Sequence, residues 1–177
     1  GDAYAQYIIG TAYRDGGLLI PDTAKAQKLL ERAAEQDLDA AQYALGKLYL
    51  SDDADVHDPT KGIYWLKRSA DNGNDYAAYR LGKEYYRGKT IGRSLTTAAK
   101  WFERGVQAGN QYAQYMLGKL YLMGQGVEYD KKLGMYWLSQ SAAQGNVYAK
   151  ALLQRQDSGR PPHVFLAVTH LFHHMSR

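Results

Sequence analysis

A period of 36 residues runs through most of this 177-residue chain. Its clearest marker is a glycine that follows leucine or isoleucine and precedes a tyrosine by three residues. These glycines are Gly10, Gly46, Gly82 and Gly118. A sustained period of this length is typical of stacked supersecondary units and not of one globular core. The sequence therefore predicts a repeat protein in which each unit packs mainly on its neighbours.

Each unit begins with a helical pattern that contains the marker glycine. In the last full copy, Ala113, Leu117 and Leu120 fall at i, i+4 and i+7 and, with Tyr121, form a core stripe. Glycine inside a helix costs about 1 kcal/mol relative to alanine. Because the glycine recurs beside this stripe, we expect its missing side chain to let a partner helix approach closely.

A second helical pattern follows a loop in each unit. Its expected N-caps are Asp22, Asp58, Ser94 and Asp130. Its bulky core position is occupied by Leu29, Trp65, Trp101 and Trp137. Glycines suited to a left-handed C-terminal cap end it at Gly73, Gly109 and Gly145. Asp37 holds that position in the first unit, so we expect a looser helix end there.

The phrases ALGKLY, D-x-x-K, YWL and A-x-x-G-N together resemble the Sel-one-like repeat family, a branch of the tetratricopeptide-type helical repeats. The resemblance implies an all-α fold, a right-handed α-solenoid of antiparallel helix pairs. The expected array covers residues 1–158. It has full repeats at about 3–38, 39–74, 75–110 and 111–146 and a partial fifth at 147–158. After the Gly159–Pro162 break, a non-repeat capping helix is expected within 159–177.

The same resemblance implies that the first helices line a concave groove. The groove positions in this sequence are Tyr7, Tyr43, Lys47, Tyr79, Lys83, Tyr115, Lys119 and Arg155. One interpretation is a trough for a protein or peptide partner, acidic or carboxylate-bearing, because tyrosine offers rigid contact area and lysine a positive charge. The other is that the tyrosines pack between adjacent helices, since an apolar ring with a polar tip suits both roles.

Two further partners fit the sequence. Basic residues among aromatics can hold single-stranded nucleic acid, although the net charge is only +4. The tail RPPHVFLAVTHLFHHMSR resembles the repeat segment of bacterial mobilisation relaxases, which implies an accessory role beside a DNA-processing domain or the transfer machinery. Apart from these two partners, the chain could associate with itself through the C-terminal helix. The chain lacks an initiator methionine and begins within a repeat, so we expect a segment of a longer protein.

No pattern in the sequence predicts catalysis. There is no GxSxG elbow, phosphate-binding loop or paired-carboxylate motif, so we expect no enzymatic activity and no cofactor. His170 and His174 share a helical face, but two ligands do not close a metal site. The Asp52–Asp58 loop lacks the glycine and glutamate of a calcium loop. With no cysteine, leader or membrane span visible, we expect a cytoplasmic protein.

Overall fold

The computed structural model describes residues 1–52 and 55–157, and all regular secondary structure in these ranges is α-helical. The first helices of the units are α1 (Ala3–Asp15), α3 (Asp39–Tyr49), α5 (Asp75–Arg87), α7 (Gln111–Met123) and α9 (Val147–Asp157). The second helices are α2 (Thr23–Glu35), α4 (Pro59–Asp71), α6 (Leu95–Gln107) and α8 (Lys131–Ala143). The even-numbered helices start 36 residues apart, which confirms the predicted all-α solenoid. The expected closing helix, with His170 and His174, lies outside the described residues.

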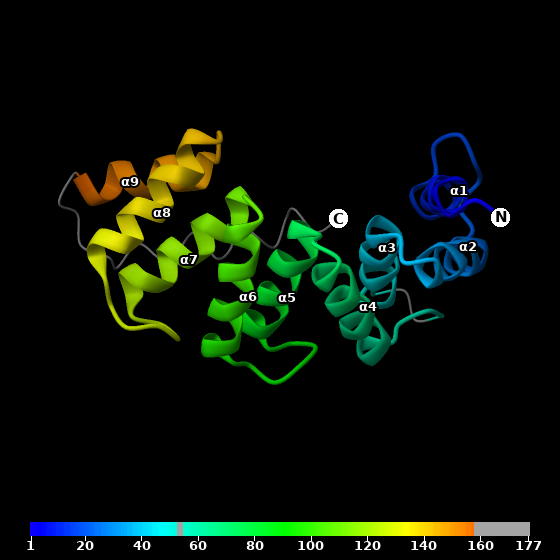
Figure 1. The fold of residues 1–177 in the computed structure, drawn as a ribbon, viewed down its shortest axis with the longest axis horizontal. Helices are drawn as coiled ribbons and strands as arrows, with labels where there is room; N and C mark the ends of the chain where they lie inside the picture. Colours follow the sequence, from blue (N-terminus) through cyan, green and yellow to red (C-terminus); the bar gives the residue numbers. More distant parts are fainter. Residues whose placement is uncertain (53–54, 158–177) are drawn as a thin grey trace.

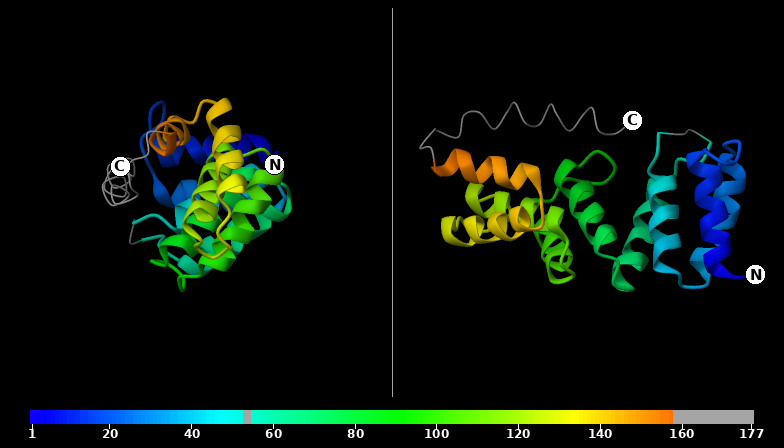
Figure 2. Two further views of the ribbon diagram at one scale, coloured as in Figure 1. Left: turned by 90° about the vertical axis from the view of Figure 1, so that its left-hand side faces the viewer. Right: turned by 90° about the horizontal axis from the view of Figure 1, so that it is seen from above.

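The helix pairs stack side by side from α1 at one end of the molecule to α9 at the other (Figure 1). The helix axes turn along the stack, from upright in α1–α4 to nearly lengthwise in α8 and α9 (Figure 2, right). Each helix packs on the next one in the chain, and odd-numbered neighbours such as α1 and α3 also contact each other. Tyrosine rings also join α3 to α5 and α7 to α9, so the odd-numbered helices form one continuous side of the array.

The predicted N-caps begin the even-numbered helices. The side chain of Asp22 accepts a hydrogen bond from the backbone N–H of Lys25, and the other three caps repeat this contact. The backbone N–H of each cap also donates to a tyrosine carbonyl of the preceding helix at 2.9–3.1 Å. The pairs are Asp22–Tyr13, Asp58–Tyr49, Ser94–Tyr85 and Asp130–Tyr121. These two contacts hold both ends of the loop within each unit, so the two helices of a unit keep their register although the loop sequences differ.

The glycines after α4, α6 and α8 adopt the predicted left-handed backbone, with φ of 92°, 84° and 96° at Gly73, Gly109 and Gly145. The expectation of a looser end to α2 is wrong. Asp37 takes the same conformation with φ 62°, and α2 has the same 13 residues as α4. The Asp37 carboxylate accepts hydrogen bonds from Arg68 and from Gln42, and these contacts hold the turn in place.

The marker glycines face the second helix of their own unit. A Cβ on Gly118 would lie 2.9 Å from the carbonyl oxygen of Gly134 and 3.0 Å from Leu138 Cγ. The residue opposite the glycine is thus the one after the tryptophan. Leu138 is fully buried, whereas Trp137 is half-buried and packs against the core, so the tryptophans lie at the border of the core and not at its centre.

Asparagine side chains join successive units. Asn110 Oδ1 accepts from the backbone N–H of Ala113 at 2.8 Å and so caps α7. Its Nδ2 donates to Asp75 Oδ2, at the start of α5, at 2.8 Å. Asn74 makes the same two contacts one unit earlier, with Ala77 and Asp39. Each asparagine therefore fixes the start of one odd-numbered helix against the start of the previous one.

Candidate functional site

Tyrosine pairs connect successive odd-numbered helices. Three of the four rings of the expected groove row lie next to a tyrosine 33 residues later. The pairs are Tyr43–Tyr76, Tyr79–Tyr112 and Tyr115–Tyr148, with ring centroids 6.4, 5.6 and 6.2 Å apart. The inner members are half-buried or buried, and burial raises the pKa of Tyr79 to about 12. Tyr76 and Tyr112 remain exposed. The row therefore packs the helices together and also presents aromatic surface.

The two ends of this row differ from its centre. Position 40 is alanine, and Tyr7 pairs instead with Tyr4 on its own helix, at 6.1 Å between centroids. At the other end, Arg155 is exposed on α9 and its charge opposes the effect of burial on the pKa of Tyr115. Both predicted residues therefore lie beside the row, but neither repeats the central geometry.

The three lysines of the groove row occupy three different environments. Lys47 is exposed and Lys83 half-buried, and each ammonium lies 5.5 Å from the ring of the tyrosine four residues before it. Lys119 is only 9% exposed and lies over the ring of Tyr86 on α5 instead. Among the described residues, none of the three forms an ion pair with a carboxylate. The three lysines therefore have the same position in the repeat but different surroundings.

Further cations gather around Lys83. Arg80 and Arg87 stand three residues before and four residues after it, on the same face of α5. Burial lowers the pKa of Lys83 to about 8, and the charges of Arg87 and Arg80 act in the same direction. Partial burial and the charges of Arg14 and Arg80 likewise lower the pKa of Lys47. Arg14 of α1, Lys47 of α3 and the three cations of α5 therefore form one cluster of positive charge.

Acidic side chains balance only part of this group. Asp15 accepts hydrogen bonds from Arg14 at 2.6 and 2.7 Å. Glu84 Oε1 lies 2.9 Å from Arg80 Nε, but this nitrogen is buried and has no aligned hydrogen-bond partner in the described part of the chain. Lys47, Lys83 and Arg87 form no ion pair there. The face of α3 and α5 thus carries an excess of positive charge.

Sequence reasoning missed Arg80 because it followed the residues that recur. The positions of Arg80 and Glu84 are occupied by Ala44 and Leu48 in the preceding unit, which are buried. The sequence signal for Arg80 was an oppositely charged pair, four residues apart, at two positions that are apolar in the preceding unit.

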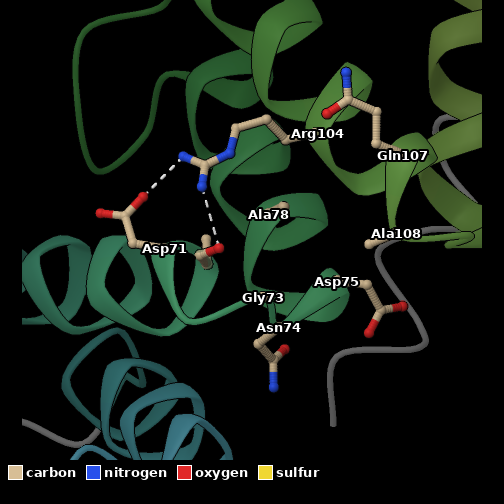
Figure 3. A pocket seen from close by; sticks show the side chains of 9 residues that line it. Asp71, Gly73, Asn74, Asp75, Ala78, Arg104, Gln107 and Ala108 are labelled. Atoms are coloured by element: carbon tan, nitrogen blue, oxygen red, sulfur yellow. Dashed lines mark hydrogen bonds and ion pairs between the residues drawn. The ribbon is translucent and has the colours of Figure 1, made fainter.

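A pocket of about 290 Å³ lies away from these lysines, where α4, α5 and α6 meet (Figure 3). In other units an amide pair crosses this place, as in Gln144 Nε2 to Gln114 Oε1 at 2.9 Å. The third unit has Ala108 and Ala78 there instead. The ion pair of Arg104 with Asp71, 2.9 Å, forms one wall of the pocket. The pocket is therefore the space left by a missing amide bridge.

The described residues contain no group of three or more histidine, aspartate or glutamate side chains placed to hold a metal ion. Within the same ranges, each helix is too short or too polar to cross a membrane.

Solved structures with the same fold were found by comparison. The protective antigen c5321, present in uropathogenic Escherichia coli strains and described as having an SLR fold, is 32% identical with a TM-score of 0.79, over 84% of this chain and 32% of that chain. A Sel1 repeat protein from Oxalobacter formigenes is 31% identical with a TM-score of 0.77, over 88% and 46% of the two chains. The present chain thus spans less than half the length of either protein.

A more distant match shows the fold alone. Helicobacter pylori cysteine rich protein B is 20% identical with a TM-score of 0.61, over 78% of this chain and 99% of that chain. No curated protein sequence gave a match. The model of the Sel1 repeat matches residues 3–38, 39–74, 75–110 and 111–146. With four such repeats over most of its length, the chain belongs to the Sel1 repeat family.

Proposed function

We propose that this protein is a non-catalytic scaffold that binds an acidic protein or peptide along the side formed by its odd-numbered helices. Sel1-like repeat proteins generally act as protein-interaction scaffolds. The finer assignment, to the tyrosine- and lysine-bearing side, rests on one observation. Lys47 and Lys83 lie beside tyrosine rings without a carboxylate partner in the described residues.

The charges on this side favour an acidic ligand. A lysine that packs on an aromatic ring keeps its ammonium group positioned, and its charge remains available to a second group. Exposed tyrosines next to these lysines, such as Tyr76, add contact area with little loss of conformational entropy. An extended peptide that places carboxylates near the lysines would therefore find both charge and apolar surface on one side of the array.

The test is selection from a random peptide library followed by affinity measurement. We expect the selected peptides to be rich in Asp and Glu. Their binding to a Lys47→Glu, Lys83→Glu variant should fall at least about tenfold, because two favourable charge contacts become repulsive. The matched control is Lys67→Glu, Lys100→Glu, which reverses two exposed lysines of α4 and α6. Equal affinity in the two variants, both with native helix content by circular dichroism, would refute the proposal.

Lys119 is left out of this variant because it is buried, and a carboxylate at that position would cost folding free energy. Its reversal would confuse loss of binding with loss of structure.

The alternative ligand is single-stranded DNA, as expected for an accessory module of a mobilisation relaxase. The same surface supports it, because bases can stack on exposed tyrosines while lysines contact phosphates. A single-stranded oligonucleotide should then bind at low salt and be released as salt rises, with the same dependence on Lys47 and Lys83. Absence of binding at low salt would exclude this alternative.

A further inference from the structure

The cationic group of α3 and α5 is concentrated in one place. Arg80, Lys83 and Arg87 share one face of α5. Like charges at such spacings destabilise a helix by about 0.2–0.5 kcal/mol per pair. The corresponding positions in α7 are Met116, Lys119 and Met123, so the family pattern does not require three cations. α5 therefore carries two like-charge contacts, beside its Arg80–Glu84 ion pair, that the repeat pattern does not require.

The surroundings of Lys83 leave this charge unbalanced. Lys47, on α3, belongs to the same group of cations, since burial and the charges of Arg14 and Arg80 lower its pKa. The carboxylates that raise the pKa values of these two lysines are Asp15 for Lys47 and Glu84 for Lys83. Asp15 already accepts two hydrogen bonds from Arg14. Glu84 lies against Arg80 and accepts a hydrogen bond from Thr90 Oγ1 at 2.9 Å. Neither carboxylate is thus free to neutralise Lys83.

We propose that the cations Lys47, Arg80, Lys83 and Arg87 form a binding site for one doubly charged anionic group of the partner. This inference rests on the proposed function and deepens it by naming the chemistry of the anchor. A dianion placed among these side chains would give an acceptor to Lys83 and Arg87, which form no ion pair among the described residues. Two sources have this chemistry in a peptide, a phosphoryl group and a pair of adjacent carboxylates.

The site should lose affinity as pH rises. The groups that act on Lys83 are Arg80, Arg87 and Glu84 of its own helix, and its ammonium lies over the Tyr79 ring. The pKa of Lys83 is about 8, so this side chain is mostly charged at pH 7 and mostly neutral at pH 9. If only the charged form binds, affinity falls by about tenfold between these values. Arginine remains charged over this range and reduces the effect.

The experiment is an NMR titration of the full chain with sodium sulfate and with sodium succinate, at pH 7 and pH 9 and constant ionic strength. Neither dianion titrates between these pH values. We expect saturable shifts of amides in α3 and α5 at pH 7 and about tenfold weaker binding at pH 9. Lys83→Arg should lose less affinity between pH 7 and pH 9 than the wild type, and Lys83→Met should bind at least about tenfold more weakly at pH 7. Tighter sulfate binding assigns a phosphoryl group, and tighter succinate binding assigns paired carboxylates.

Shifts outside α3 and α5, or unchanged affinity in Lys83→Met, would overturn the proposal. Retained amide dispersion in the NMR spectrum of each variant shows that it is folded. Because the titration uses no peptide, its failure is separate from failure of the peptide-binding assay. A dianion site without peptide binding would instead leave the proposed function unsupported.

Discussion

Replacing Gly118 with alanine tests the packing between the two helices of a unit. At an unhindered helix position, this change stabilises a protein by about 1 kcal/mol. Here the added Cβ would lie 2.9 Å from the carbonyl oxygen of Gly134 and 3.1 Å from the backbone N of Leu138. These are backbone atoms of α8, so relief requires the helices to separate. Overpacking of this kind costs about 1–3 kcal/mol.

The net expectation for Gly118→Ala is a loss of up to about 2 kcal/mol in the free energy of unfolding. Gly10→Ala is the matched control, since Gly10 has the same place in its repeat. Its nearest neighbours are Leu30 Cγ and Cδ2 and Leu29 Cβ at 3.0–3.2 Å, with no backbone atom among them, so less movement of the helix is needed. Urea denaturation followed by circular dichroism measures both variants. A Gly118→Ala protein more stable than the wild type, or no less stable than Gly10→Ala, would refute the reasoning.

Three other predictions concern the polar contacts. Ala78→Gln with Ala108→Gln should rebuild the missing amide bridge and raise the free energy of unfolding by about 1 kcal/mol in thermal denaturation, whereas a loss would contradict the assignment of the pocket. Asn110→Ala removes the cap of α7 and its link to Asp75, and a loss of about 2 kcal/mol is expected in urea denaturation; a negligible loss would show that the link is dispensable. Lys83 has a folded pKa of about 8, below its ordinary 10.5, so the unfolded chain binds more protons between these values. Wild-type stability relative to Lys83→Met should therefore rise from pH 8 to pH 10, and a constant difference would count against the lowered pKa.

The sequence was sufficient to predict the repeat, its helix pairs and the N-caps of the even-numbered helices. Those features depend on residues that recur, and their contacts are local, as in Asp22 with the N–H of Lys25. The second role of the asparagines was not predicted. Asn110 contacts Asp75, a residue of the previous unit, and the repeat pattern alone does not show which units contact through which atoms.

The environments of the groove lysines could not be predicted for a related reason. Lys47 and Lys119 have the same position in the repeat, yet one is exposed and the other buried. The difference lies in the preceding odd-numbered helix. The charge of Arg14 lowers the pKa of Lys47. Two units later, the repeat position of Arg14 is occupied by Tyr86, and Lys119 lies over its ring. An arginine of the preceding odd-numbered helix therefore lies near the first lysine, and an aromatic ring of that helix covers the second.

The most direct test of the proposed function is to locate a selected acidic peptide on the protein by NMR chemical-shift mapping. If the odd-numbered helices form the binding surface, the largest amide shifts will fall in α3 and α5, near Lys47 and Lys83, and will disappear in the Lys47→Glu, Lys83→Glu variant. Shifts centred on α4 and α6, retained in that variant and lost in Lys67→Glu, Lys100→Glu, would contradict the account.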